Sequence, residues 1–126
     1  MTRNGKLILV IEDDETVQSI LKDALESEGF NTIFSDNGKD GLELAQNRLP
    51  HLILLDVMLP GMNGWEVCRR LKNNSMTRPI PILFLTARDQ YEDMMEAISL
   101  EAAGYITKPF SVKELKQKIK KVLRMN

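Results

Sequence analysis

The sequence predicts an α/β domain built on a doubly wound sheet of five parallel strands with five helices. Five short apolar segments alternate with segments of helical periodicity, and no repeat or low-complexity tract interrupts this alternation. The three longest apolar segments are continuous, as expected of parallel strands that helices cover on both faces. Right-handed crossovers between such strands place the helices on both sides of the sheet. The expected strands are Leu7 to Ile11, Thr32 to Ser35, Leu52 to Leu55, Ile82 to Leu85 and Tyr105 to Thr107.

Two of the expected helices show a clear apolar face. The last one also has a start signal, because Ser111 and Glu114 form a capping-box pattern and Phe110 can pack onto Leu115. A polar stretch from Lys72 to Arg78 is expected to be a loop. The apolar faces consist of Val17, Ile20, Leu21, Ala24 and Leu25 in the first helix and of Val112, Leu115, Ile119, Val122 and Leu123 in the last.

Length and composition limit the class of protein. A chain of 126 residues fits one domain with its own core, and 43% hydrophobic with 28% charged residues is typical of soluble globular proteins. Seventeen basic and eighteen acidic residues give a net charge of -1, so direct binding to nucleic acid or to an anionic membrane is not expected. A single cysteine, Cys68, excludes an internal disulfide. Without a signal peptide or a membrane-length apolar stretch, a cytoplasmic protein is expected.

Reactive side chains follow four of the expected strands at the points where those strands end. The carboxyl ends of parallel strands share one edge of the sheet, which is where ligands bind in open α/β folds. Each residue alone is compatible with a helix cap or a solvated loop, but the set together indicates a site. The residues are Glu12 and Asp13 after the first strand, Asp56 after the third, Thr86 after the fourth and Lys108 after the fifth.

The acidic residues of this set predict a magnesium site. Converging carboxylates repel one another unless a cation lies among them, and an all-oxygen pocket with room for water is what Mg²⁺ selects. Zinc is disfavoured because His51 and Cys68 lie elsewhere in the sequence. With a divalent cation, Lys108 and the Thr86 hydroxyl around one aspartate, the favoured chemistry is phosphoryl transfer to Asp56.

These motifs resemble the receiver domains of two-component signalling, from Lys6 to about Leu123. The resemblance implies a flavodoxin-like sheet with strand order 2-1-3-4-5. It also implies a single receiver domain over residues 1–126 with no output domain in this chain. The matching motifs are Glu12-Asp13 after an apolar strand, Asp56 followed by Val-Met-Leu-Pro-Gly-Met-Asn-Gly, Thr86-Ala87, and Lys108-Pro109-Phe110.

The resemblance assigns roles to single residues. It implies that Asp56 is the phosphoacceptor and that Thr86 and Lys108 contact the phosphoryl group. Tyr105 would be the aromatic switch that turns as Thr86 moves, and the Lys108-Pro109 peptide bond would be cis. The implied magnesium ligands are Glu12, Asp13, Asp56 and the backbone carbonyl of Met58.

Partners follow from the same resemblance. The phosphodonor would be a sensor histidine kinase or a histidine phosphotransfer protein, and the domain would catalyse only its own phosphorylation and dephosphorylation. The signal would leave through the face formed by the fourth helix, the fifth strand and the last helix, toward a downstream target protein or a second copy in a homodimer. No direct contact with nucleic acid or a membrane is expected.

Two positions depart from the commonest family pattern. The first acid of the pair is Glu12 rather than aspartate, a variant that keeps metal binding with a longer side chain. Glu101 stands where a glycine often ends the fourth helix. Glycine readily takes the left-handed cap conformation and glutamate does not, so the sequence does not predict how this helix ends.

Several residues also have ordinary structural interpretations. Asp14 and Glu15 fit the start of the first helix better than a metal site, because acidic residues there face the positive end of the helix dipole. Tyr105 alone fits a half-buried strand aromatic, and His51 fits a loop residue rather than a phosphodonor. The remaining set, Trp65, Val67, Cys68 and Leu71, fits helix packing rather than a cofactor pocket.

Two other functions use similar residues. A haloacid-dehalogenase-like phosphatase also combines an aspartate nucleophile, magnesium, a hydroxyl and a lysine, but it requires a second aspartate where this chain has Met58. An interaction scaffold that is never phosphorylated is the other alternative. Phosphoryl uptake distinguishes the three.

Overall fold

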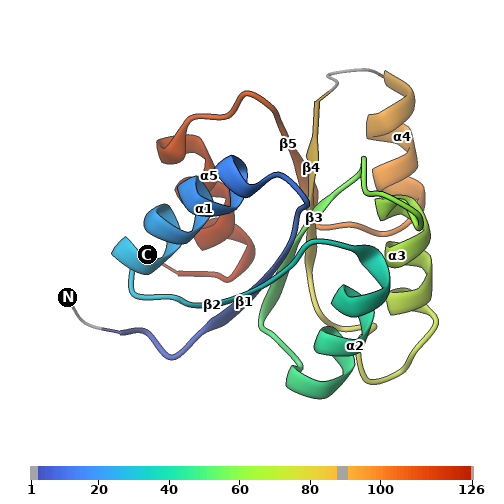
Figure 1. Ribbon diagram of the computed structural model, residues 1–126, viewed down its shortest axis with the longest axis horizontal. Helices are drawn as coiled ribbons and strands as arrows, with labels where there is room; N and C mark the ends of the chain where they lie inside the picture. The colour runs from blue at the N-terminus through green and yellow to red at the C-terminus, as the bar shows by residue number, and fades with distance from the viewer. Residues whose placement is uncertain (1–2, 88–90, 126) are drawn as a thin grey trace.

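The computed structural model describes residues 3–87 and 91–125 and contains a parallel sheet between two layers of helices (Figure 1). The strand order is β2-β1-β3-β4-β5, so the expected doubly wound, flavodoxin-like topology is confirmed. The strands are β1 (Leu7–Ile11), β2 (Asn31–Ser35), β3 (Leu52–Asp56), β4 (Ile82–Thr86) and β5 (Gly104–Thr107). The helices are α1 (Glu15–Ser27), α2 (Gly38–Arg48), α3 (Gly64–Lys72), α4 (Tyr91–Ser99) and α5 (Val112–Val122).

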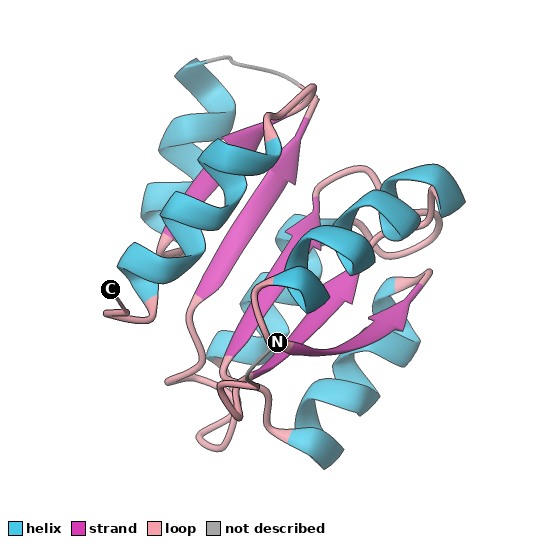
Figure 2. Ribbon diagram, turned by 90° about the vertical axis from the view of Figure 1, so that its left-hand side faces the viewer, coloured by secondary structure: helices cyan, strands magenta, loops and turns pink. Residues whose placement is uncertain are grey.

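The helices cover both faces of the sheet, with α1 and α5 on one side and α2, α3 and α4 on the other (Figures 1 and 2). Side chains of a strand alternate between these layers. In β3, Leu52 and Leu54 pack with α1 and α5, whereas Ile53 and Leu55 pack with α2 and α3. This two-sided burial explains why the central strands are continuously apolar. None of the helices in the described part of the chain is long and apolar enough to cross a membrane.

Side chains fix the starts of the helices. The Asp14 carboxylate caps α1 by accepting hydrogen bonds from the backbone N–H groups of Thr16, at 2.8 Å, and Val17, at 3.1 Å. The Ser111 hydroxyl caps α5 in the same way by accepting from the Glu114 N–H at 3.0 Å. The cap by Ser111 was expected from the sequence, as was the place of Asp14 at the start of the first helix. Each side chain satisfies backbone donors that have no partner within the helix.

The chain leaves α4 through a left-handed residue, and that residue is Glu101, with φ of 59°. The N–H of Glu101 donates to the Ile98 carbonyl and the N–H of Ala102 donates to the Ala97 carbonyl, both at 3.0 Å. This pair of bonds is the Schellman motif that glycine usually completes. The glutamate therefore takes the conformation that its residue type disfavours.

Candidate functional site

The carboxyl ends of the strands bring the expected acidic residues together. Glu12, Asp13 and Asp56 each offer a carboxylate oxygen, and these oxygens lie within 4.8 Å of one another. Glu12 and Asp56 are 0% and 4% exposed, whereas Asp13 faces solvent. Two buried oxygen donors and one at the surface leave one side open to water. This donor set fits Mg²⁺, which takes oxygen ligands and retains several waters.

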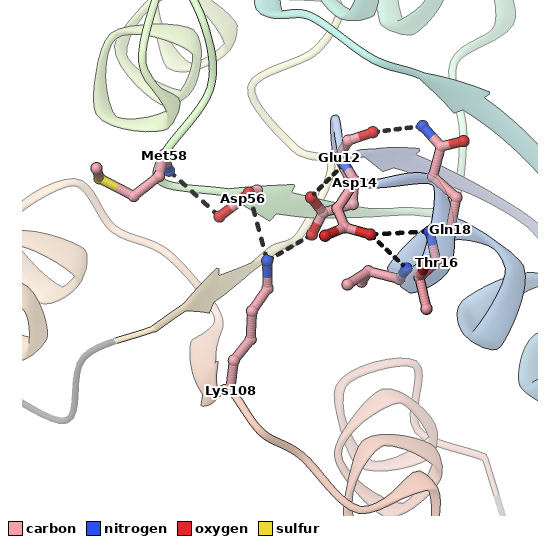
Figure 3. Close-up of polar contacts among 8 residues, drawn as sticks. Glu12, Asp14, Thr16, Gln18, Asp56, Met58 and Lys108 are labelled. Atoms are coloured by element: carbon pink, nitrogen blue, oxygen red, sulfur yellow. Dashed lines mark hydrogen bonds and ion pairs between the residues drawn. The ribbon is translucent and has the colours of Figure 1, made fainter.

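The loop after Asp56 turns back sharply over the end of β3. The Met58 backbone N–H donates to Asp56 Oδ1 at 3.2 Å and so helps to orient the carboxylate (Figure 3). At the start of α3, the Gly64 N–H donates to the Val57 carbonyl at 2.9 Å. A Cβ at Gly64 would lie 2.2 Å from the Asp56 carbonyl oxygen, so only glycine permits this approach. Metal coordination by the Met58 carbonyl stays a prediction.

Lys108 reaches from the end of β5 into the acidic cluster (Figure 3). Its ammonium lies 2.6 Å from Glu12 Oε1 and 3.4 Å from Asp56 Oδ2. The Lys108-Pro109 peptide bond is cis, as the resemblance implied. Burial raises the pKa of the Glu12 carboxyl, although the hydrogen bond from Lys108 opposes that change. Burial alone would lower the pKa of Lys108, but its bond to Glu12 and the charge of Asp56 raise it.

The backbone around Glu12 is tied to the start of α1. Glu12 Oε2 accepts a hydrogen bond from the Asp14 N–H at 3.0 Å, and the Gln18 side-chain amide donates to the Glu12 carbonyl (Figure 3). The three consecutive acids therefore have different surroundings, because Glu12 is buried, Asp13 is exposed and Asp14 caps the helix. Sequence reasoning did not identify Gln18, and its position one turn into an amphipathic helix gives no signal.

The two expected switch residues both contact α4. The Thr86 hydroxyl, in a side chain that is 3% exposed, donates to Asp93 Oδ2 at 3.2 Å. The Tyr105 hydroxyl lies 2.8 Å from Met94 Sδ, and its half-buried ring packs against the core. The phosphoryl contact of Thr86 and the switch role of Tyr105 stay predictions. Sequence reasoning missed Asp93, because its partner is set by the packing of α4.

The other residues weighed in the sequence have packing roles. Cys68 is buried, and burial raises the pKa of its thiol to about 11. Trp65 packs on Phe84 with ring centroids 4.5 Å apart. His51 is an exposed loop residue whose Nδ1 accepts a hydrogen bond from the Leu7 N–H at 3.0 Å. The interpretation of these three as structural residues agrees with their contacts.

Fold and site together define a flavodoxin-like α/β domain with an acidic pocket and one lysine at the carboxyl edge of its sheet. The response regulator receiver domain model matches residues 8–120, and the chain belongs to this family. The family resemblance of the sequence motifs is therefore confirmed.

Curated proteins with similar sequences include transcriptional regulatory proteins. The alkaline phosphatase synthesis transcriptional regulatory protein PhoP of Bacillus subtilis (strain 168) is 40% identical over 120 residues, covering 95% of this chain and 49% of PhoP. The chain spans about half the length of the curated relatives it matches.

Solved structures agree with this family assignment. A putative response regulator from Chloroflexus aurantiacus is 30% identical with a TM-score of 0.90, covering 94% of this chain and 98% of that one. The receiver domain of a sensor histidine kinase from Pseudomonas aeruginosa PAO1, solved with a magnesium ion coordinated in its active site cleft, is 26% identical with a TM-score of 0.88. Its match covers 95% of this chain and 98% of that one.

Proposed function

We propose that this chain is the phosphoacceptor domain of a two-component phosphorelay, modified on Asp56. The phosphodonor would be the phosphohistidine of a sensor histidine kinase or of a histidine phosphotransfer protein. Family membership supports this proposal. The observation that carries it is the Lys108 ammonium, 3.4 Å from Asp56 Oδ2, beside a cluster of three carboxylates. In this arrangement the Asp56 carboxylate would be a nucleophile beside the charges that phosphoryl transfer requires.

In the proposed reaction an Asp56 carboxylate oxygen attacks phosphorus, an O–P bond forms, and the P–N bond to the donor imidazole breaks. When bound, Mg²⁺ would be held by Glu12, Asp13, Asp56 and the Met58 carbonyl and would neutralise charge on the phosphoryl oxygens. The Met58 N–H keeps Asp56 Oδ1 in place. That bond leaves Oδ2, the oxygen nearer to Lys108, as the nucleophile.

Two further groups of the chain would meet the incoming phosphoryl group. Lys108 is already within ion-pair distance of Asp56, so its ammonium needs only to exchange Glu12 for a phosphoryl oxygen. Thr86 lies at the end of β4, next to β3, and its hydroxyl would donate to another phosphoryl oxygen. These contacts neutralise charge as it develops on the transferring group.

The domain would act on no substrate other than its own aspartate. The position of the second, acid-base aspartate in haloacid-dehalogenase-like phosphatases holds Met58, whose side chain is 64% exposed and cannot transfer a proton. This residue disfavours the phosphatase alternative. An unphosphorylated scaffold remains the second candidate, and only phosphoryl uptake separates it from the proposal.

Output is proposed to run through the α4-β5-α5 face to a downstream target protein or to a second copy in a homodimer. On α4, Met95 and Ile98 are 43% and 64% exposed and share one side of the helix, because they are three residues apart. The relatives are named transcriptional regulatory proteins, which supports control of transcription as the output. The proposed receiver domain spans residues 1–126 and would act in the cytoplasm.

Incubation with Mg²⁺ and acetyl phosphate tests the central claim. We expect one phosphoryl group per chain by intact-mass spectrometry, removable by hydroxylamine, and none on Asp56→Asn. Asp36→Asn is the matched control, because Asp36 is an exposed aspartate after β2 outside the acidic cluster. Equal modification of Asp56→Asn and the wild type would refute the assignment of Asp56, and no uptake by the wild type would favour the scaffold.

A further inference from the structure

Asp93 lies in the first turn of α4 and accepts a hydrogen bond from Thr86, the residue proposed to contact the phosphoryl group. The Thr86 hydroxyl donates to Asp93 Oδ2 at 3.2 Å, and the Thr86 side chain is almost completely buried. We infer that Asp93 is a positioning residue that acts through Thr86, holding its hydroxyl on the α4 side until phosphorylation draws it away. This inference rests on the proposed phosphorylation of Asp56.

The space beside Thr86 permits such a movement. A hollow of about 310 Å³ lies at the carboxyl ends of β3 and β4, between α4 and the loop after Asp56. Asp93 and Thr86 border the same hollow as the loop residues. The Thr86 side chain can therefore turn from one wall toward the other without displacing core side chains. The hollow is lined by Val57, Met58, Trp65, Thr86, Ala87 and Asp93.

Among the residues that the structure describes, the Thr86 contact is one of three polar side-chain contacts that attach α4 to the rest of the domain. The next residue, Met94, receives the Tyr105 hydroxyl at 2.8 Å, and Glu96 forms an ion pair with Arg69 of α3 at 2.7 Å. Of these contacts, the hydrogen bond to Asp93 connects α4 to Thr86, which lies at the proposed phosphorylation site. A change in the partner of Thr86 therefore removes one restraint on α4 directly.

Asp93 and a phosphoryl oxygen compete for the hydroxyl proton of Thr86. A hydroxyl has a single proton to donate, so it cannot donate to the Asp93 carboxylate and to a phosphoryl oxygen at the same time. Phosphorylation must exchange one bond for the other. Asp93 therefore stabilises the unphosphorylated state, and removing its carboxylate shifts the balance toward the phosphorylated conformation.

Affinity for beryllofluoride, a phosphoryl mimic, at saturating Mg²⁺ measures this balance by calorimetric titration. Asp93→Ala is expected to bind about three- to tenfold more tightly than the wild type, the range that one hydrogen bond supplies. Asp93→Asn keeps an oxygen acceptor without the charge and is expected to tighten binding by a smaller factor. Glu101→Gln removes a charge beyond the end of α4, away from Thr86, and is expected to bind as the wild type does.

The same variants in a Thr86→Ala background test whether the effect passes through the hydroxyl. We expect the tightening by Asp93→Ala to disappear there, because no Thr86 hydroxyl is left to release. If Asp93→Ala raised the affinity for beryllofluoride equally with and without that hydroxyl, the inference would be overturned. Such a result would show that the Asp93 carboxylate acts only by repelling the bound anion. Unchanged affinity in Asp93→Ala would also overturn it. A wild-type protein that binds no beryllofluoride would instead contradict the proposed function.

Discussion

The Lys108 ammonium lies 2.6 Å from Glu12 Oε1, and the Glu12 side chain has no solvent exposure. The same ammonium is 3.4 Å from Asp56 Oδ2, so a single positive charge serves two buried carboxylates. A buried ion pair adds little net stability, but removing one partner leaves a charge that neither water nor protein compensates. Lys108 therefore holds the pocket together before any phosphoryl group arrives.

Lys108→Met should destabilise the metal-free domain by about 3 kcal/mol, the usual effect of breaking a buried pair. Urea unfolding at pH 7 measures this, and Mg²⁺ should restore part of the loss. Because the folded pKa of Lys108 is raised above its ordinary value of 10.5, its stabilising effect is complete at neutral pH and is lost only as the pH rises through the folded pKa. Lys113→Met, at an exposed site on α5, is the control and should change stability little. An unchanged midpoint for Lys108→Met would show that Glu12 is compensated in another way.

Asp13→Ala should have opposite effects on stability and on function. Without metal, removing one carboxylate from the cluster relieves repulsion, and we expect a gain of about 0.5 kcal/mol at this exposed position. With Mg²⁺ the sign should reverse, because a ligand is lost, and phosphorylation should weaken as well. Thermal melts of both proteins with and without Mg²⁺ test this. A variant that is clearly less stable in the absence of metal would indicate a structural role for Asp13.

The end of α1 is joined to α5 by ion pairs whose strength depends on pH. Glu28 lies 2.9 Å from the Lys120 ammonium and 3.4 Å from that of Lys116, and the bond to Lys120 lowers the pKa of the Glu28 carboxyl. A lowered folded pKa means stability that is present above the ordinary value of 4.5 and is lost as the pH falls through the folded pKa.

Glu28→Gln should therefore be less stable than the wild type at pH 7, by about 0.5 kcal/mol for a pair near the surface. The difference should shrink as the pH falls below 4.5 and vanish once Glu28 is protonated in both states. Urea midpoints across this pH range measure it. Glu43→Gln, an exposed carboxylate on α2, controls for the general loss of charge. A difference that stays constant with pH would exclude the ion pairs as its cause.

The position of the site was predictable because parallel strands fix it. Asp56 and Thr86 are the last residues of β3 and β4, and any parallel sheet brings such ends to one edge. The place of Asp14 at the start of α1 was predictable as well, because acidic residues favour the positive end of the helix dipole. Family resemblance supplied the strand order and the cis bond before Pro109, which the residue pattern alone does not give.

The contacts that sequence did not reveal depend on tertiary packing. Asp93 meets Thr86 only because α4 is rotated to face the end of β4, and periodicity does not fix that rotation. Gly64 is required because the start of α3 touches the Asp56 backbone. The local sequence pattern does not predict this contact between α3 and the end of β3. At Glu101, packing around the end of α4 overrides the local preference of the residue.

Beryllofluoride with Mg²⁺ should change amide NMR signals well beyond Asp56, in the segment from Thr86 to Ser111. Thr86 and Tyr105 each contact α4, so a shift of either residue reaches that helix. Coupling between sites is typically about 1 to 3 kcal/mol, so a shift in populations is expected rather than a new fold. Signals that change only around Asp56, while Tyr105 and α4 stay silent, would refute the switch.

Glu101→Gly should make the domain more stable, since Glu101 ends α4 in the left-handed conformation at φ of 59°. A side chain at this φ is unfavourable by about 1 kcal/mol relative to glycine, which is more than the unfolded chain gains from the extra freedom of glycine. The ion pair from Arg78 to Glu101 at 3.3 Å offsets little, because the two side chains are 59% and 67% exposed. Glu101→Ala is the matched control, as it removes the same ion pair but keeps a Cβ. Urea midpoints should place the glycine variant above the wild type and the alanine variant at or slightly below it. A glycine variant no more stable than the alanine variant would show that the end of α4 carries no strain.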